Sequence, residues 1–418
     1  MGYDAYACGC PAGVFQEVHK MKPVWHYRPE NNWINDPNGL THYRGWYHMF
    51  YQYNPGGDQW GDIHWGHARS RDLLSWETLP IALTPDAAKG ELHCFSGGCC
   101  KDEMGKPRFF YTSVGAAEDG RDCTHGAQQW YAEAVDDDLL KLVQTDANAL
   151  LDDIHPGFHV RDWRDPCVLR YGEQYLMVLG GCVEERGCVL LYTSADMRHW
   201  TYRHILAISG KADGIPWECP NLIPADGKFA LIYSPCTEVR VKTGTLDADL
   251  RFIEETDEVL EPERNGYYAP QAFIDEAGRA IVIGWLPESD QVLHKGWSGV
   301  MSLPRLLTIT EDGLCMAPIP GAERLPGVQR LRIAREELPC TWTLHDNGEE
   351  RTLLTLAPDG TLTMDRSHST LAETPARHPV IRAVPVKDVN DVFLAVDGSA
   401  VETMVNGKWL TARIYPTR

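Results

Sequence analysis

The sequence predicts an all-β protein, and two observations support this prediction. Short apolar and aromatic runs recur from residue 22 to residue 321 with turn residues between them, for example WYHMFYQYNP, RFFYTSVG, QYLMVLGG and FALIYSP. No long stretch with the 3.6-residue period of an amphipathic helix interrupts these runs. The chain has 418 residues, more than the roughly 250 to 300 residues at which a single hydrophobic core stops growing. We therefore expect two domains.

Two repeats divide residues 22–321 into five units. The segment SRDLLSW at Ser70–Trp76 is echoed by SADMRHW at Ser194–Trp200, a separation that suits two units of about sixty residues each. A polar or small residue followed by Pro or Gly also recurs at intervals of about fifty to seventy residues, at Asp36-Pro37, Ser96-Gly97, Asp165-Pro166, Glu218-Cys219-Pro220 and Ala269-Pro270. In a β-propeller each blade is a four-stranded sheet, and equivalent positions of all blades face one central axis. The repeats predict a five-bladed β-propeller over residues 22–321, with the recurring positions around one pocket.

The rest of the chain has a different pattern. Residues 322–337 are rich in charge and predict a linker with one helical turn. Residues 338–418 alternate apolar and polar positions between Asn-Gly and Asp-Gly turns, which is the hairpin pattern of an antiparallel sandwich with one solvated face. We expect a small C-terminal β-sandwich there. Residues 1–21 match neither domain and are assigned as an N-terminal extension.

Composition excludes several classes of partner. The formal net charge is -20, and the 39 basic residues form no basic stripe, so we expect no nucleic acid partner. The first twenty residues lack the basic start and apolar core of a secretory signal, and no run of about 18 apolar residues occurs anywhere. We expect a cytoplasmic protein with no membrane partner. Thirteen cysteines, an odd number, favour free thiols in a reducing compartment.

Three of the five recurring positions carry a carboxyl group, at Asp36, Asp165 and Glu218. A Trp stands within three residues before each of them, and a Pro follows directly or one residue later. Proline holds the residue before it in an extended conformation, and the Trp offers an apolar face to a sugar ring. Cleaving a glycosidic bond with retention requires one ionised and one protonated carboxyl group about 5 to 5.5 Å apart. A single such residue would be an ordinary solvated turn carboxylate, but three in phase with the blades predict a glycosidase site.

The motifs around these residues resemble those of glycoside hydrolase family 32, which comprises invertases, fructanases and fructosyltransferases. WINDPNG at Trp33–Gly39, FSG at Phe95–Gly97, RDP at Arg164–Pro166 and WECP at Trp217–Pro220 occur in that family's order. The resemblance continues through Tyr51–Pro55, Trp65–His67, Tyr268–Gln271 and Leu303–Arg305, and so covers almost the entire chain. It implies a propeller followed by a β-sandwich, for which the segment after residue 337 is short by the standard of the family.

The resemblance implies a role for each carboxyl group in a retaining β-fructofuranosidase. Asp36 would be the nucleophile, Glu218 the acid and then the base, and Asp165 would hold fructose hydroxyls and stabilise the transition state. Three acids facing one axis cannot all ionise cheaply. We expect Arg164 to keep its neighbour Asp165 charged and Glu218 to hold its proton at neutral pH.

The same resemblance implies further contacts to fructose, from Asn35, Gln52, Trp60, Phe95, Ser96, Arg164, Tyr268 and Trp285. For the amide and hydroxyl side chains the alternative is local turn bonding, and for Trp60 and Trp285 it is packing in the core. The implied hydrolysis uses no cofactor and no metal. His64 and His67 are spaced i, i+3 but lack a third ligand in the sequence, so a structural role is expected for them.

Several alternatives stay open on the sequence alone. A fructosyltransferase would form the same covalent intermediate and pass fructose to a sugar acceptor, and a propeller that only binds sugar would have lost catalysis. An inverting arabinan-degrading propeller also has three acids, but WINDPNG argues against it. Expected substrates are sucrose and short fructo-oligosaccharides, while phosphorylated sucrose and linkage preference stay open. A short sandwich also predicts an exposed sheet edge that a second copy could cover in a homo-oligomer.

Overall fold

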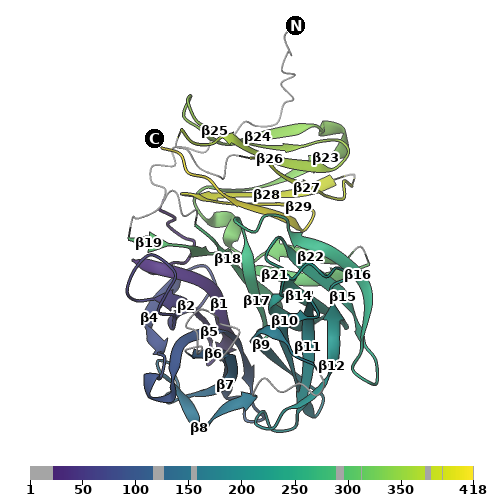
Figure 1. The fold of residues 1–418 in the computed structure, drawn as a ribbon. Coiled ribbons are helices and arrows are strands. Elements are labelled where there is room, and N and C mark those ends of the chain that lie inside the picture. Colours follow the sequence, from purple (N-terminus) through teal and green to yellow (C-terminus); the bar gives the residue numbers. More distant parts are fainter. Residues whose placement is uncertain are drawn as a thin grey trace.

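The computed structural model describes residues 22–115, 127–151, 158–288, 296–311, 313–371, 378–387 and 389–417. The predicted extension over residues 1–21 lies outside these residues. Within them the chain forms thirty strands, and the only helices are three short 3-10 turns, η1 (Ala87–Lys89), η2 (Ala322–Arg324) and η3 (Arg335–Glu337). The all-β prediction is confirmed. Figure 1 shows the two parts, a ring of sheets from the first three quarters of the chain and a layered pair of sheets packed on one side of it.

The ring consists of five antiparallel blades in chain order. The first blade consists of β1 (Asn32–Tyr43), β2 (Trp46–Asn54), β3 (His64–Ser70) and β4 (Trp76–Leu83), and the second of β5 (Glu91–Lys101), β6 (Pro107–Gly115), β7 (Ala127–Ala134) and β8 (Leu142–Leu151). The third consists of β9 (Arg161–Tyr171), β10 (Gln174–Val183), β11 (Arg186–Ser194) and β12 (Thr201–Ile208), and the fourth of β13 (Glu218–Ala225), β14 (Lys228–Ser234), β15 (Val239–Leu246) and β16 (Phe252–Glu261). The fifth consists of β17 (Tyr268–Ile274), β18 (Ala280–Leu286), β21 (Arg305–Thr310) and β22 (Gly313–Pro318). The first strand of each blade contacts the first strand of the next, and β17 contacts β1. The five-bladed propeller is confirmed.

Two very short strands lie between β18 and β21, and one of them connects the last blade to the first. β20 (Val300–Met301) pairs with β18, and β19 (Trp297–Ser298) pairs in parallel with β1, opposite Asn32 and Trp33. The chain between β18 and β21 therefore hydrogen-bonds across the seam between the fifth and first blades. This contact closes the ring beside the WINDPNG motif.

Each innermost strand has a bulge at its recurring position. In all five, two residues of the strand face one residue of its partner, and these pairs are Asn35 and Asp36, Phe95 and Ser96, Asp165 and Pro166, Cys219 and Pro220, and Ala269 and Pro270. A bulge leaves a residue unpaired and turns its side chain, so a proline without an N–H fits there. Asp165, Cys219 and Ala269 have positive φ angles of 65°, 47° and 44°. The sequence repeat thus marks five equivalent distortions around the axis.

The second repeat also has a structural basis. Ser70–Trp76 and Ser194–Trp200 form the same turn, between the third and fourth strands of the first and third blades. The Asp72 carboxylate accepts backbone bonds from Leu74 and Ser75, and Asp196 accepts the equivalent bonds from the backbone of Arg198 and His199. Leucine and methionine fill the same buried position at 73 and 197, both with positive φ. The echo is confirmed as a blade repeat.

The C-terminal part is a sandwich of two four-stranded sheets. One sheet has the order β23 (Val328–Ala334), β28 (Val389–Asp397), β29 (Ala400–Val405) and β30 (Lys408–Arg413), and the other has β24 (Cys340–Asp346), β25 (Arg351–Leu356), β26 (Thr361–His368) and β27 (Val380–Ala383). The predicted Asn-Gly and Asp-Gly hairpins all occur, and Asn406 and Gly407 have the positive φ angles of a two-residue hairpin turn.

The expected linker over residues 322–337 is wrong in its second half. Val328–Ala334 is a strand that pairs with β28 along its whole length. The charge that suggested a linker belongs instead to an edge strand, since exposed Arg330 pairs with Asp391 of β28. Charged side chains on an edge discourage further strand pairing, so they are typical of this position.

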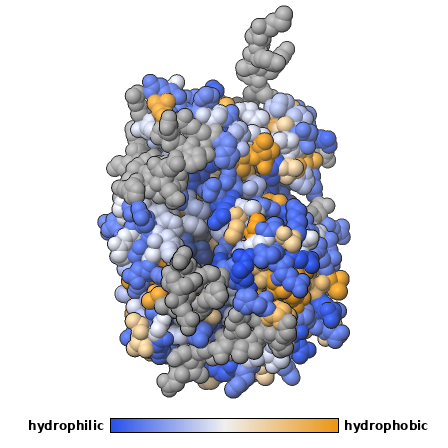
Figure 2. All heavy atoms as spheres, in the orientation of Figure 1, coloured by the Kyte–Doolittle hydropathy of each residue, from blue (hydrophilic) through white to orange (hydrophobic). Residues whose placement is uncertain are grey.

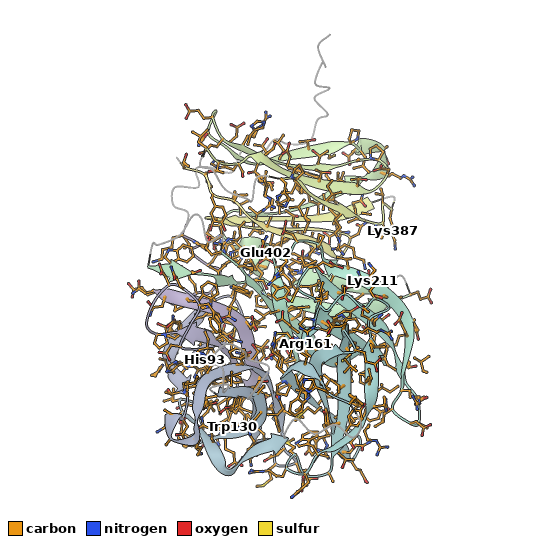
Figure 3. All side chains as sticks on the ribbon, viewed as in Figure 1. His93, Trp130, Arg161, Lys211, Lys387 and Glu402 are labelled. Atoms are coloured by element: carbon orange, nitrogen blue, oxygen red, sulfur yellow. The ribbon has the colours of Figure 1, made fainter. Side chains whose placement is uncertain are left out.

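The junction between propeller and sandwich is closely packed and contains buried charge. Phe393, Met404 and Trp409 of the sandwich belong to the same hydrophobic cluster as residues of the first and fifth blades. Arg305 of β21 donates to Glu261 at 2.7 Å and to Glu402 at 2.5 Å, and all three side chains are fully buried. Figure 3 shows Glu402 at this junction. The two parts therefore form one body.

Hydrophilic residues cover much of the face shown in Figure 2, and hydrophobic residues form scattered patches. Among the described residues, no helix has the length and apolar character needed to cross a bilayer.

Candidate active site

One cavity of about 290 Å³ opens at the end of the propeller axis where the bulges lie. It is lined by Trp33, Asn35, Asp36, Gln52, Trp60, Phe95, Arg164, Asp165, Glu218, Cys219, Arg264, Tyr268 and Trp285. These residues include all three predicted carboxyl groups and seven of the eight predicted fructose contacts. They come from all five blades, as the repeat predicts.

A second cavity, of about 350 Å³, lies farther along the same innermost strands. Its lining is largely apolar, and its one carboxyl residue, Asp102, is already bound by Arg108 at 2.7 Å. A glycosidase needs two carboxyl groups, so only the first cavity is suited to the predicted chemistry.

Asp36 is held by four donors in the first cavity. Its Oδ2 accepts hydrogen bonds from the Ser96 hydroxyl at 2.6 Å, from Gln52 Nε2 at 3.3 Å and from the Cys219 thiol at 3.4 Å. Its Oδ1 accepts one bond, from Asn35 Nδ2 at 3.1 Å. Oδ2 is therefore fixed by three neighbours, whereas Oδ1 keeps lone pairs for another partner.

Ser96 differs from the other predicted contacts because it does not line the cavity. Its side chain is buried behind Asp36, and it also accepts a hydrogen bond from Gln52. Gln52 lines the cavity itself, whereas Ser96 reaches it through Asp36 and supports the carboxylate there.

Asp165 is almost completely buried. Its backbone N–H donates to Thr112 Oγ1 at 2.9 Å, and its Oδ2 accepts from the backbone N–H of Cys219 at 2.8 Å. The residue keeps its positive φ because both of these neighbours fix it. Bonds from the adjacent blades therefore aim its carboxyl group into the cavity.

Glu218 has the strongest polar partners in the cavity. Arg164 Nη2 donates to its Oε1 at 2.5 Å, and both the Tyr268 hydroxyl and the Cys236 thiol donate to its Oε2, the thiol at 3.2 Å. Arg164 lies farther from Asp165, with 3.9 Å between Nε and Oδ2. The guanidinium expected beside Asp165 thus reaches across to the next blade.

This arrangement overturns the expected distribution of protons. Burial, with a contribution from Asp36, raises the pKa of Asp165 to about 7, and Arg164 opposes this only in part. Burial also raises the pKa of Asp36, with a contribution from Glu218. Burial acts on Glu218 too, but Arg164 and Tyr268 outweigh it and lower its pKa. In the ligand-free site the proton is therefore expected on Asp165, and the prediction of a protonated Glu218 is wrong for this state.

Aromatic side chains form the walls of the cavity. Trp285 meets Trp33 edge to face at 5.7 Å between ring centroids, and Trp60 meets Phe95 in the same way at 6.1 Å. Because Trp60 is 48% exposed, it lies at the rim of the cavity and is not packed in the core. Aromatic faces of this kind can pack against the apolar side of a sugar ring.

Sequence reasoning missed two residues next to Glu218. Arg264 lines the cavity from the segment between β16 and β17, and Cys236, between β14 and β15, bonds to Glu218. Neither lies in a recurring motif, so the repeat gave no signal for them. Among the described residues, no group of three His, Cys, Asp or Glu side chains is placed to hold a metal ion.

The fold and the three carboxyl groups together define a glycoside hydrolase built on a β-propeller. The family model described as the glycosyl hydrolases family 32 N-terminal domain matches residues 26–318. The chain belongs to glycoside hydrolase family 32.

Individual relatives agree with this assignment. A sucrose-6-phosphate hydrolase of Escherichia coli is 28% identical over 94% of this chain and 89% of its own length. A cell wall β-fructofuranosidase of Zea mays is 32% identical over 76% of this chain, which spans 58% of the maize enzyme. Among solved structures, a sucrose-6-phosphate hydrolase from Lactobacillus gasseri has a TM-score of 0.81 at 23% identity, covering 95% of this chain and 88% of that one.

Proposed function

We propose that this chain hydrolyses terminal non-reducing β-D-fructofuranosides, such as sucrose and short fructo-oligosaccharides, through a covalent fructosyl-enzyme intermediate. The observation that carries this proposal is the convergence of Asp36, Asp165 and Glu218 in one aromatic-walled cavity at the propeller axis. The names of the relatives, which are sucrose-6-phosphate hydrolases and β-fructofuranosidases, support the same substrate class.

In the first step a carboxylate oxygen of Asp36 attacks the anomeric carbon C2 of fructose. Glu218 gives its proton to the glycosidic oxygen, the bond from that oxygen to C2 breaks, and the leaving sugar departs as an alcohol. Oδ1 of Asp36 is the better placed oxygen, because Oδ2 is occupied by three donors. Ser96, Gln52 and Cys219 thus orient the nucleophile.

In the second step the same residues act in reverse. Ionised Glu218 takes a proton from water, the water oxygen bonds to C2, and the bond from C2 to Asp36 breaks. The product is β-fructose with retained configuration, and Glu218 has regained its proton. Asp165 and Arg164 hold the ring hydroxyls during both steps.

The proposal requires the pocket proton to move when substrate binds. In the ligand-free site Arg164 stabilises ionised Glu218. Hydroxyl groups of fructose that engage Arg164 and Asp165 would draw the guanidinium away from Glu218 and weaken the interaction that lowers its pKa. Binding of the sugar would then prepare the acid for its first step.

The free thiols support a reducing location. In the described part of the chain, free thiols are found at Cys94, Cys99, Cys100, Cys167, Cys182, Cys188, Cys219, Cys236 and Cys315. Disulfides are rare in the cytosol but common in secreted proteins. We infer from this that the enzyme works in the cytoplasm on small sugars that have entered the cell.

Product analysis with sucrose tests the proposed function. Equal amounts of glucose and free fructose are expected, with β-fructose as the first anomer. An excess of glucose over fructose would instead indicate transfer to a sugar acceptor, and α-fructose as first product would exclude the covalent mechanism. Absence of both sugars would reject catalysis on sucrose.

A further inference from the structure

Arg264 is the one cavity residue to which neither the motifs nor the proposed mechanism gives a role. It is exposed and lies between β16 and β17. Its guanidinium stacks over the Tyr268 ring, 5.0 Å from the centroid, and its Nη1 donates to the backbone carbonyl of Cys236 at 2.8 Å. Two contacts therefore hold the cation in one position at the mouth of the cavity.

These contacts place Arg264 on the side of the leaving group. Tyr268 and Cys236 are also the two residues that donate to Oε2 of Glu218. Glu218 protonates the oxygen of the departing sugar. Arg264 is held by both residues that donate to Oε2 of Glu218, so it lies next to that sugar and away from the fructose side at Asp36.

The charge of Arg264 has no partner within the described residues. No carboxylate there forms an ion pair with it, and the adjacent Glu263 is bound by Arg366 at 3.2 Å. The other cation of the cavity, Arg164, is already paired with Glu218 and Asp162. The guanidinium has five N–H donors, and one atom, Nη1, is engaged by a carbonyl, so its remaining donors stay available.

We propose that Arg264 binds a phosphate group on the leaving hexose, so that the preferred substrates are β-fructofuranosides with a phosphorylated leaving sugar. This inference rests on the proposed function. A planar guanidinium matches phosphate oxygens with two parallel hydrogen bonds. A dianionic substrate would otherwise meet three carboxyl groups in a protein of formal net charge -20, which makes a local cation necessary. The relatives include a sucrose-6-phosphate hydrolase and a β-fructofuranosidase. Membership of the family therefore does not decide between phosphorylated and plain substrates, and Arg264 favours the phosphorylated ones.

The test compares kcat/KM for sucrose and for sucrose phosphorylated at C6 of its glucose unit. The native enzyme should favour the phosphorylated sugar, and Arg264→Gln should lower that preference by about tenfold, which corresponds to the loss of a charge-assisted hydrogen bond. Arg264→Lys should keep part of the preference, because lysine keeps the positive charge but lacks the paired N–H donors of the guanidinium. Arg203→Gln is the matched control, since Arg203 is exposed on β12 and lies outside the cavity lining.

A binding measurement makes the inference independent of turnover. By calorimetry, glucose 6-phosphate should bind more tightly than glucose, and Arg264→Gln should remove most of that difference while Arg203→Gln retains it. Equal preference for the two sucroses in the native enzyme, or equal losses on both in Arg264→Gln, would overturn the inference and leave the proposed function intact. Tight, Arg264-dependent binding of glucose 6-phosphate without cleavage of either sucrose would support the phosphate site and reject the proposed function.

Discussion

Arg164 donates to Glu218 at 2.5 Å across two neighbouring blades, although it stands next to Asp165 in the chain. This bond stabilises the ionised form of the residue that must act as the acid. The pocket proton of the ligand-free site is accordingly expected on Asp165, whose pKa burial raises to about 7. Activity should therefore depend on a proton that is lost close to neutral pH.

The first prediction concerns the pH dependence of kcat/KM, which reports the free enzyme. Asp165 is protonated below its pKa of about 7 and ionised above it, so kcat/KM should fall as the pH rises through that value. At low pH kcat/KM should fall again as Asp36, whose pKa burial raises, becomes protonated. Initial rates between pH 4 and 9, roughly the range of these titrations, test this, with circular dichroism to show that the fold persists. A constant kcat/KM above neutral pH would contradict the assignment of the proton.

The second prediction concerns the nucleophile. Asp36→Ala should leave less than about 1% of the native kcat, because no other group supplies the attacking oxygen. Asp249→Ala is the matched control, since Asp249 is exposed in the turn between β15 and β16. Rates with sucrose measure both variants. If Asp36→Ala has a native-like fold and keeps more than about 1% of the native kcat, another residue attacks C2.

The catalytic residues were predictable from sequence because they sit on a repeat. Asp36 and Asp165 lie in the bulges of their innermost strands, and Glu218 comes directly before the bulge of its own strand. The propeller therefore converts regular spacing along the chain into proximity at the axis. The blade count follows from the same spacing. The carboxyl groups and most of the cavity lining could thus be predicted before any side chain was placed.

The partners of these residues could not be predicted in the same way. Arg164 is adjacent to Asp165 in sequence, but the bulge in β9 lets its side chain reach Glu218 on β13. Arg264 and Cys236 come from segments between strands, which have no period. The edge strand Val328–Ala334 was mistaken for a linker because its arginines are exposed, as edge strands require. Side-chain reach and strand position depend on tertiary packing.

The third prediction concerns Cys236, a positioning residue that acts through Glu218. Its thiol lies 3.2 Å from Oε2 of Glu218, and burial raises its pKa to about 11, so it stays a neutral donor. Cys236→Ala removes one of the bonds that favour ionised Glu218, so the pKa of Glu218 should rise. Glu218 and Asp165 interact, so the pocket proton would be shared between them and lost at higher pH. The fall of kcat/KM above neutral pH should move in the same direction.

Cys236→Ser separates this effect from a change in packing. A hydroxyl can replace the thiol as donor, so the serine variant should keep a pH profile close to the native one. Identical profiles in the alanine and serine variants would indicate that the hydrogen bond to Glu218 has no influence on the titration.

The fourth prediction concerns the junction between the two parts of the molecule. Arg305 is fully buried, bonds to Glu261 and Glu402, and stacks 4.0 Å from the Trp409 ring centroid. Arg305→Met would leave buried Glu261 without its cation and Glu402 with His26 alone, 2.8 Å away. Removing one partner of a buried ion pair costs about 3 to 5 kcal/mol of stability. Denaturant unfolding followed by tryptophan fluorescence measures this loss. Arg330→Met is the control, because its pair with Asp391 is partly exposed at the surface and surface pairs contribute about 0 to 1 kcal/mol. Equal stabilities of the two variants would show that the buried charges do not hold the sandwich against the propeller.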